Sequence, residues 1–421
     1  MQFCTIVENS KKMKALNNNI AIVFDDLTEF YVMQKAIDKL KELHYQVDII
    51  VPYDSGYNNL AEHTLQTITN LGYSPLDDAP SNKTYKILLT PYPGLDAVKR
   101  IKYIYHLRYP YGAISAKPNP SYYPNHIYQY DAMFSFNTYD GFLETYGPKI
   151  YPLPYWRYTS FKRKPQSKNQ PPILLLLPTF GTDTSFINHL PDSTITELKK
   201  EFKIISKAHH AVHFGIDGAD TLQRLEQISD EFYTSDTPID DLLKKATIVL
   251  SDNSGAIFES ICANVPIAIF TNDPNSRHLG KLNTLQYKLI QQKIIPHATK
   301  PNEILPMLHN IKPFIKKQKA IREKLFITNS KKPFDDFISI IKHYIEADED
   351  QDSRRILHNL FLKELIEQEK TIDSLKQENE KLTKANLELT QYITDIHNST
   401  SWKITSPIRK LKLKGNTNAQ K

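Results

Sequence analysis

Apolar and polar residues follow two kinds of pattern along the first 150 residues. Short apolar runs at 19–24 (NIAIVF) and 46–52 (QVDIIVP) flank a segment, 28–44, whose apolar residues have helical spacing. A strand, a helix and a second strand in this order are typical of a parallel sheet. Three further apolar runs predict more strands of the same domain: 85–92, 101–107 and 130–137.

A second series of the same kind begins at residue 173 with ILLLLPTF. It predicts alternating helices and strands up to the apolar run PIAIF at 266–270, and amphipathic segments at about 300–346 that finish this domain and pack back on the first. Residues 155–172 between the two series are basic, contain proline and lack periodicity, so we interpret them as an interdomain linker. The predicted fold class is therefore α/β, with two doubly wound, Rossmann-like domains at 1–154 and 173–346. Such domains bind ligands in the cleft outside the carboxyl ends of their strands.

The pattern changes again after a polar linker at 347–358. Residues 359–397 carry heptads, with Asn379 and Asn386 at a positions and seven apolar residues at a or d positions: Leu365, Ile372, Leu375, Leu382, Leu389, Ile393 and Ile396. Sustained heptads predict a coiled coil, and asparagine at a favours two strands in a fixed register. We therefore expect a homodimer; the alternative is a single amphipathic helix packed on the other domains.

Charge is unevenly distributed. The net charge is +6, and residues 400–421 contain six basic side chains and no acidic one, so the rest of the chain is neutral. This is not the basic face of a nucleic-acid-binding protein. The two cysteines, Cys4 and Cys262, predict no disulfide framework and a reducing compartment. No segment has the pattern of a secretory signal or of a membrane span, so the expected location is cytoplasmic.

The stretch SDNSGAIFES at 251–260 lies at the junction between a predicted strand and the helix that follows it. Backbone N–H groups and the helix dipole attract phosphate there, and a glycine allows close approach. We identify five residues as candidates for binding a nucleotide, with Glu259 placed to reach ribose hydroxyls: Ser251, Asp252, Ser254, Gly255 and Glu259. The alternative is that Asp252 or Ser254 only caps the helix.

Other polar clusters give no metal site. His209, His210 and His213 lack the flanking pattern of a zinc site. The acidic residues at 348–350 lie in a polar linker, so we interpret them as solvated. Asp25 and Asp26 end the first strand, where capping of the next helix is the expected role and contact with an acceptor the alternative.

Several segments together resemble the CDP-glycerol glycerophosphotransferase family, the teichoic-acid-type polymerases and primases. The segments are PIDDLLKKATIVLSDNSGAIFESICANVPIAIF (238–270), ILLLLPTF (173–180), IISKAHH (204–210) and YDAMFSFNTYDGFLETYGPKIYPLPY (130–155). The resemblance covers roughly residues 20–345 and implies a GT-B-like fold, with an acceptor-side first domain and a donor-side second domain. It places Lys207 and His209 at the donor pyrophosphate and Thr179 at the start of the donor domain, and it implies no metal or other cofactor.

The resemblance also implies a catalytic histidine in the first domain. The family carries Trp-His-Gly after a strand, with the histidine as general base, and YIYHLRYPYG (103–112) stands at the corresponding place without that Trp and Gly. His106 is therefore the candidate base, with Arg108 and Tyr111 as weaker candidates for substrate contacts. The alternative is a strand histidine held by packing and one hydrogen bond.

Residues 398–421 form a basic tail, and its segment 398–414 resembles a short element at the ends of many bacterial surface-polysaccharide glycosyltransferases. NSTSWKITSPIRKLKLK combines Trp402 with interleaved basic and apolar residues, which favours the surface of an anionic membrane. The alternative is a disordered cationic tail.

These features predict a cytoplasmic transferase of cell-envelope polymer synthesis that works at the inner face of the membrane. The leading reaction moves a glycerol-phosphate or similar polyol-phosphate unit from a CDP-activated donor to a hydroxyl of a lipid-linked or polymer acceptor, releasing CMP. The turn at 251–260 also resembles that of UDP-N-acetylglucosamine 2-epimerases, so the second hypothesis is a GT-B glycosyltransferase that uses a nucleotide sugar. The third is a non-catalytic scaffold that recruits other enzymes through its coiled coil.

Overall fold

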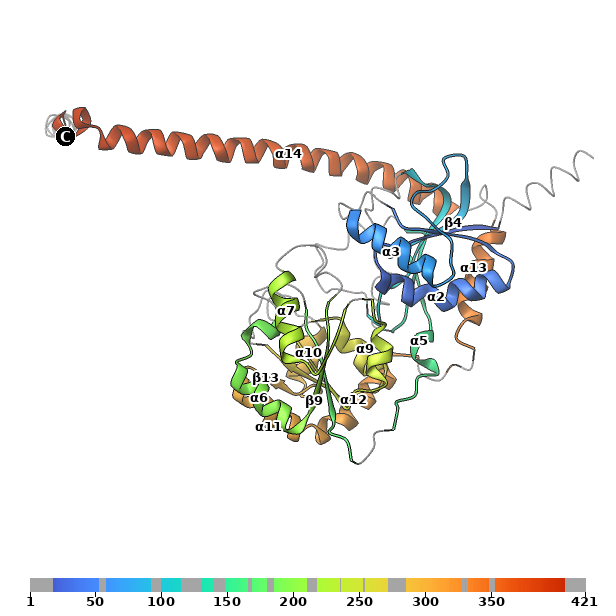
Figure 1. Ribbon diagram of the computed structural model, residues 1–421. Coiled ribbons are helices and arrows are strands. Elements are labelled where there is room, and N and C mark those ends of the chain that lie inside the picture. Colours follow the sequence, from blue (N-terminus) through green and yellow to red (C-terminus); the bar gives the residue numbers. More distant parts are fainter. Residues whose placement is uncertain are drawn as a thin grey trace, which may run out of the picture. The chain divides into compact units, whose positions relative to one another are not determined.

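The first sheet is wholly parallel in the computed structural model (Figure 1). Its strands run in the order β3-β2-β1-β4-β5-β6-β7. They are β1 (Asn19–Val23), β2 (Gln46–Ile50), β3 (Pro75–Leu76), β4 (Thr84–Thr90), β5 (Lys102–Arg108), β6 (Ala132–Ser135) and β7 (Lys149–Pro152). Helices α2 (Leu27–Glu42) and α3 (Asn58–Asn70) follow β1 and β2. The direction of chain progression reverses between β1 and β4, which is the switch point of this sheet.

The structure describes residues 18–52, 58–91, 100–114, 130–138, 148–165, 169–179, 185–209, 218–234, 236–252, 254–271, 285–327, 330, 332–347 and 353–405. His210, His213, the acidic residues at 348–350 and the basic residues beyond 405 lie outside this part of the chain.

The second sheet is also parallel, in the order β10-β9-β8-β11-β12-β13. Its strands are β8 (Ile173–Leu177), β9 (Lys203–Lys207), β10 (Glu231–Tyr233), β11 (Ile248–Ser251), β12 (Ile267–Phe270) and β13 (His297–Ala298). The switch point lies between β8 and β11, whose last residues, Leu177 and Ser251, pair in register. The accompanying helices are α6 (Asp192–Glu201), α7 (Gly218–Ile228), α8 (Ile239–Leu243), α9 (Ala256–Cys262), α10 (Leu285–Gln291), α11 (Ile304–His309) and α12 (Lys312–Leu325).

Helix α13 (Asp335–Glu346) follows the second sheet in sequence but packs on the first. The ring of Tyr344 lies 5.1 Å from that of Tyr105 in β5, and the ring of Phe337 lies 5.2 Å from that of Phe134 in β6. Lys86 in β4 donates a hydrogen bond of 2.9 Å to the carbonyl oxygen of Ala347, just after the helix. This confirms the expectation that the segments near residue 346 return to the first domain.

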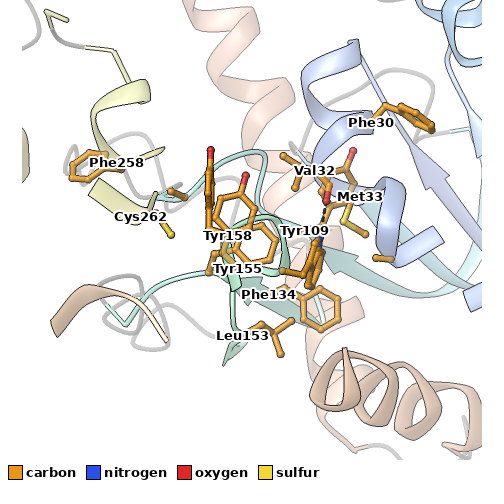
Figure 2. Close-up of a cluster of buried hydrophobic side chains, with 14 of the residues drawn as sticks. Phe30, Val32, Met33, Tyr109, Phe134, Leu153, Tyr155, Tyr158, Phe258 and Cys262 are labelled. Carbon is orange, nitrogen blue, oxygen red and sulfur yellow. Dashed lines mark hydrogen bonds between the residues drawn. The ribbon is translucent and has the colours of Figure 1, made fainter. Parts of the chain in front are cut away.

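One hydrophobic core runs from the first domain into the second. Its bridge is α5 (Trp156–Thr159) together with the preceding Tyr155. Figure 2 shows Tyr155 and Tyr158 between Tyr109 and Phe134 of the first domain and Phe258 and Cys262 of the second. The stretch that the sequence predicts as an interdomain linker thus begins with buried aromatic residues.

Residues 356–421 form a unit separate from residues 1–355. It consists of most of α14 (Ser353–Asn398), a helix of 46 residues, and of residues after it. Among the described helices, none combines the length and the hydropathy needed to span a membrane.

The two parallel sheets and their helices confirm the α/β fold class with two Rossmann-like domains, and the long C-terminal helix is present. Pairing of that helix into a coiled coil stays a prediction.

Candidate active site

The carboxyl ends of the two sheets meet at the boundary between the domains. Glu259 in α9 of the second domain accepts a hydrogen bond of 2.8 Å from the backbone N–H of Ala113, which follows β5 in the first. The charge of Asp26, just after β1, acts on the ammonium group of Lys207 at the end of β9. Because ligands of doubly wound domains bind at these strand ends, this boundary is the candidate site.

Asp252 holds the switch point of the second sheet together. Its carboxylate accepts hydrogen bonds from the backbone N–H groups of Thr179 (3.0 Å to each oxygen), Phe186 (3.2 Å) and Ser254 (3.1 Å), and only 1% of the residue is exposed. The hydroxyl of Ser251 donates to the carbonyl oxygen of Leu177 at 2.5 Å. The loops after β8 and β11 are therefore tied to each other, which gives Asp252, Ser251 and the Thr179 backbone a structural task at the predicted donor loop.

The start of α9 is open at one position. The hydroxyl of Ser254 accepts a hydrogen bond of 3.3 Å from the N–H of Ala256, the first residue of the helix. A Cβ built on Gly255 would meet no atom of the described residues within 4 Å. The structure thus brings together Thr179, Ser251, Asp252, Ser254 and Gly255 as the sequence predicts. The role of these residues in binding a donor stays a prediction.

Glu259 is buried and turned toward the first domain. Besides Ala113, its Oε1 accepts a hydrogen bond of 3.3 Å from the Tyr155 hydroxyl, and 7% of the residue is exposed. Burial raises the pKa of this carboxyl group, and the charge of Arg157 opposes the rise. Its predicted role at the ribose stays a prediction, and it would require Glu259 to share or exchange these contacts.

Lys207 and His209 lie at the end of β9, on the donor side. Burial lowers the pKa of Lys207 to about 8, and the carboxylate of Asp26 partly offsets this effect. Its Nζ donates a long hydrogen bond, 3.3 Å, to the carbonyl oxygen of Ala208. His209 is half-buried two residues further on. A cation that is held at a strand end by weak contacts is suited to binding an anionic group.

His106 lies inside the first domain. Its side chain is 1% exposed, its Nε2 is 2.8 Å from the hydroxyl oxygen of Thr90, and its ring packs on those of Tyr103 and Tyr130. This is the arrangement of a strand histidine held by packing. Arg108, two residues later, is also buried and donates from Nε to the carbonyl oxygen of Pro91 at 2.9 Å. A catalytic role of His106 stays a prediction, because contact with a substrate would require the ring to leave these partners.

The end of β1 carries three carboxyl groups. Asp26 caps α2 by accepting the N–H of Glu29 at 3.1 Å, as the sequence predicts for this pair of aspartates. The Glu29 carboxylate in turn accepts the N–H of Asp25 at 2.7 Å. Oδ1 of Asp25 is buried without a hydrogen-bond partner among the described residues. Burial, with the charge of Asp26, raises the pKa of Asp25 to about 7.

Arg157 and Asp240 link the domains at this site and were not identified from the sequence. The guanidinium group of Arg157 lies 2.6 Å from Oδ1 of Asp240 in α8, and the two side chains are 6% and 18% exposed. The signal available in the sequence was the aromatic cluster PYWRY at 154–158, which is unlike a solvated linker. Within the described residues, no group of three potential metal ligands is assembled.

No protein-family model matches this chain, and a search of curated proteins gives no match. Solved structures that resemble it include the wall teichoic acid polymerase TagF, with 12% identity, a TM-score of 0.48 and coverage of 79% of this chain and 89% of the other. A UDP-GlcNAc 2-epimerase from Neisseria meningitidis, bound to UDP-GlcNAc, has 10% identity, a TM-score of 0.46 and coverage of 78% and 99%.

The glycosyltransferase VinC, in complex with dTDP, has 10% identity, a TM-score of 0.45 and the same coverage as the epimerase. The fold assignment rests on the two sheets themselves, and the chemistry is argued from the residues described above.

Proposed function

We propose that the protein is a transferase of cell-envelope polymer synthesis that takes the transferred unit from a nucleotide-activated donor. The observation that carries this proposal is the meeting of two Rossmann-type sheets at their carboxyl ends, with Lys207 on one side and Asp25 and Asp26 on the other. A cation opposite carboxyl groups suits a reaction in which an anionic group leaves one substrate and a proton leaves the other.

Lys207 and His209 are the donor-side groups in this proposal. A nucleotide donor leaves with negative charge on its phosphate, and a fixed cation at that position stabilises the charge as it develops. In this scheme, the phosphate or sugar group binds at Gly255, which has no side chain to oppose it, beside the loop that Asp252 holds. In this scheme, Glu259 binds the ribose after exchanging its contacts with Ala113 and Tyr155.

On the acceptor side, the proton of the attacking hydroxyl needs a base. Asp25 offers a carboxylate oxygen without a hydrogen-bond partner among the described residues, and its pKa of about 7 is near the value that serves a general base at neutral pH. His106 is the second candidate, with its Nε2 at the Thr90 hydroxyl. We propose Asp25 as the base that requires the smaller rearrangement.

The leading reaction is transfer of a glycerol-phosphate or other polyol-phosphate unit from a CDP-activated donor, with release of CMP. It is supported by the resemblance of the segments around 173–180, 204–210 and 238–270 to CDP-glycerol glycerophosphotransferases. Transfer of a sugar from a nucleotide sugar is the second candidate, supported by the Ser-Gly turn at 254–255. The acceptor in either case is a lipid-linked or polymer hydroxyl, reached at the cytoplasmic membrane face through the basic C-terminal segment.

The test is nucleotide binding by the full-length protein, measured as thermal stabilisation with CDP-glycerol, CDP-ribitol, CMP, UDP and UDP-sugars. Lys207→Met should abolish most of the stabilisation, because it removes the cation at the end of β9. Lys203→Met is the matched control, since Lys203 begins the same strand and pairs with Glu231. Stabilisation by cytidine compounds supports polyol-phosphate transfer, and stabilisation by uridine compounds alone supports sugar transfer.

Loss of stabilisation in both lysine variants would contradict a site at the end of β9. Stabilisation by none of the nucleotides would contradict the proposed function and favour the scaffold hypothesis. A turnover assay then separates the two candidate bases: with Asp25 as base, Asp25→Asn lowers kcat at least 100-fold, whereas His106→Gln, which keeps a polar group beside Thr90, has the smaller effect. The reverse order would assign the base to His106.

A further inference from the structure

Helix α14 presents an apolar stripe to solvent. At 1.5 Å per residue, a helix of 46 residues is about 69 Å long. The a and d side chains on it are exposed to an extent unusual for large aliphatic residues: Ile372 43%, Leu375 59%, Leu382 59%, Leu389 58% and Ile393 52%. Helices in proteins gain most of their stability by packing an apolar face, so this stripe requires a partner.

On the opposite face of the helix, polar side chains pair with one another. Lys370 pairs with Glu367 at 3.0 Å, and the side-chain amide of Gln391 donates to Asp395 at 2.9 Å. These residues occupy c and f positions, on the side away from the stripe. The partner therefore has to contact the a and d positions, and a single narrow seam of this kind fits another helix.

Asn379 and Asn386 indicate the identity and the direction of the partner helix. Both stand at a positions, one heptad apart, and are exposed within the apolar stripe. In a parallel, in-register pair of identical helices, each asparagine side chain meets its own copy, and the two amides hydrogen-bond to each other. An antiparallel partner copy would place these amides beside d residues, which here are mainly leucine, and leave them unpaired in an apolar seam.

We propose that α14 is the dimerisation element of the protein, and that its occupant is α14 of a second copy in parallel register. The heptads from 365 to 396 form the seam, in which layers of Leu or Ile are interrupted by the Asn379 and Asn386 layers and, near its start, by Gln368 at a d position. This inference stands on α14 alone and does not depend on the reaction proposed above.

The first test is the mass of the full-length protein in solution, by size-exclusion chromatography with light scattering at about 10 µM. The expected mass is twice the 48.7 kDa of one chain. Leu382→Asp should convert the dimer to a monomer. Leu387→Asp is the matched control, because Leu387 is a leucine of the same helix, 67% exposed, at a b position outside the seam. A monomeric wild type, or a dimer lost equally in both variants, would overturn the proposal.

The register is tested by oxidative cross-linking in a Cys4→Ser background, in which the remaining Cys262 is buried. Ile396→Cys, at a d position near the end of the helix, should form a disulfide-linked dimer only if the helices are parallel. Lys384→Cys, at an f position, is the control that should stay uncross-linked. A dimer by mass without cross-linking at 396 would overturn the parallel arrangement, and equal cross-linking at 384 would overturn the assigned seam.

Discussion

Asp252 and Asp25 are the same residue type at the switch points of two similar sheets, but their surroundings differ. Asp252 follows β11 and accepts backbone hydrogen bonds from Thr179, Phe186 and Ser254. Asp25 follows β1, and its Oδ1 is buried without a hydrogen-bond partner among the described residues. One carboxylate is used by the fold, and the other is left with an unmet hydrogen bond.

The number of hydrogen-bond donors around each carboxylate indicates whether an aspartate at a strand end has a structural or a chemical role. A carboxylate that accepts several N–H groups holds loops in place and has little capacity left for a substrate. A carboxylate that lacks such donors costs free energy in its charged form, and it gains when a substrate hydroxyl supplies the missing proton donor. The position after a strand therefore does not assign a function; the hydrogen-bond donors around the carboxylate do.

The largest effect is expected for Asp252→Ala. This substitution removes the acceptor for the N–H groups of Thr179, which is partly buried, and of Phe186 and Ser254, which are buried, and each unsatisfied buried group costs about 1–3 kcal/mol. We expect the free energy of unfolding, measured by urea denaturation, to fall by about 3 kcal/mol or more. Asp252→Asn keeps one acceptor oxygen and should lose less. A loss below about 1 kcal/mol for the alanine variant would show that the loops hold without this carboxylate.

Asp25→Asn should raise the free energy of unfolding, whereas Asp252→Ala should lower it. The pKa of Asp25 is about 7 in the folded protein, above its ordinary value of 3.8, so between these values the folded state binds more protons. The charged carboxylate therefore lowers stability increasingly as pH rises from about 4 to 7, and the full cost is present above 7. We expect the variant to gain about 1–3 kcal/mol at pH 8 and nothing at pH 4.

Asp77→Asn is the control for this effect, because Asp77 is exposed. Equal urea midpoints for the wild type and Asp25→Asn at both pH values would contradict the unmet hydrogen bond. A gain in stability combined with a loss of turnover would mark Asp25 as a functional group kept at a cost to the fold.

On the donor side, Lys207 should make the affinity for a nucleotide depend on pH. Its pKa is about 8 in the folded protein, below the ordinary 10.5, because burial disfavours the ammonium form. An anionic nucleotide binds the ammonium form, so affinity should fall as pH rises above 8, by up to about tenfold per unit. Titration calorimetry between pH 7 and 9.5 should show this fall in the wild type and in Lys203→Met, but not in Lys207→Met. An unchanged slope in Lys207→Met would assign the titration to another group.

The sequence predicted the elements well where periodicity was clear. The runs at 19–24, 46–52 and 173–180 became β1, β2 and β8, and the parallel pairing in both sheets agrees with the alternation of strands and helices. The short strands β3 and β13, with two residues each, carry no periodic signal and were missed.

Contacts between the domains could not be predicted from the sequence, because the residues that make them are far apart along the chain. Arg157 and Asp240 are 83 positions apart, and Ala113 and Glu259 are 146 apart. No local pattern records such pairs, since they depend on how two complete sheets are placed. The candidate donor residues lie at one strand edge, as their positions in the sequence indicate, and their role stays a prediction. Their hydrogen-bond partners, which distinguish Asp252 from Asp25, are seen only in the structure.

Gly112→Ala should have the smallest effect on stability. It tests a single contact between the domains, the one between residue 112 and Glu259. A Cβ at this position would lie 3.3 Å from Oε1 of Glu259, closer than an ordinary contact. Replacing glycine by alanine also stabilises by about 0.4–1 kcal/mol where the backbone permits it, by restricting the unfolded chain. We expect the crowding to cancel this gain, so that Gly112→Ala changes the unfolding free energy by about −0.5 to 0 kcal/mol.

In a Glu259→Ala background the crowding is absent, and the same substitution should stabilise by about 0.5 kcal/mol. The two measurements form a double-mutant cycle with a coupling of about 0.5–1 kcal/mol. An identical effect in both backgrounds would mean that Glu259 does not rest against residue 112 in solution. Because that carboxylate is also the predicted ribose ligand, zero coupling would mean that it is available to a donor without first leaving the first domain.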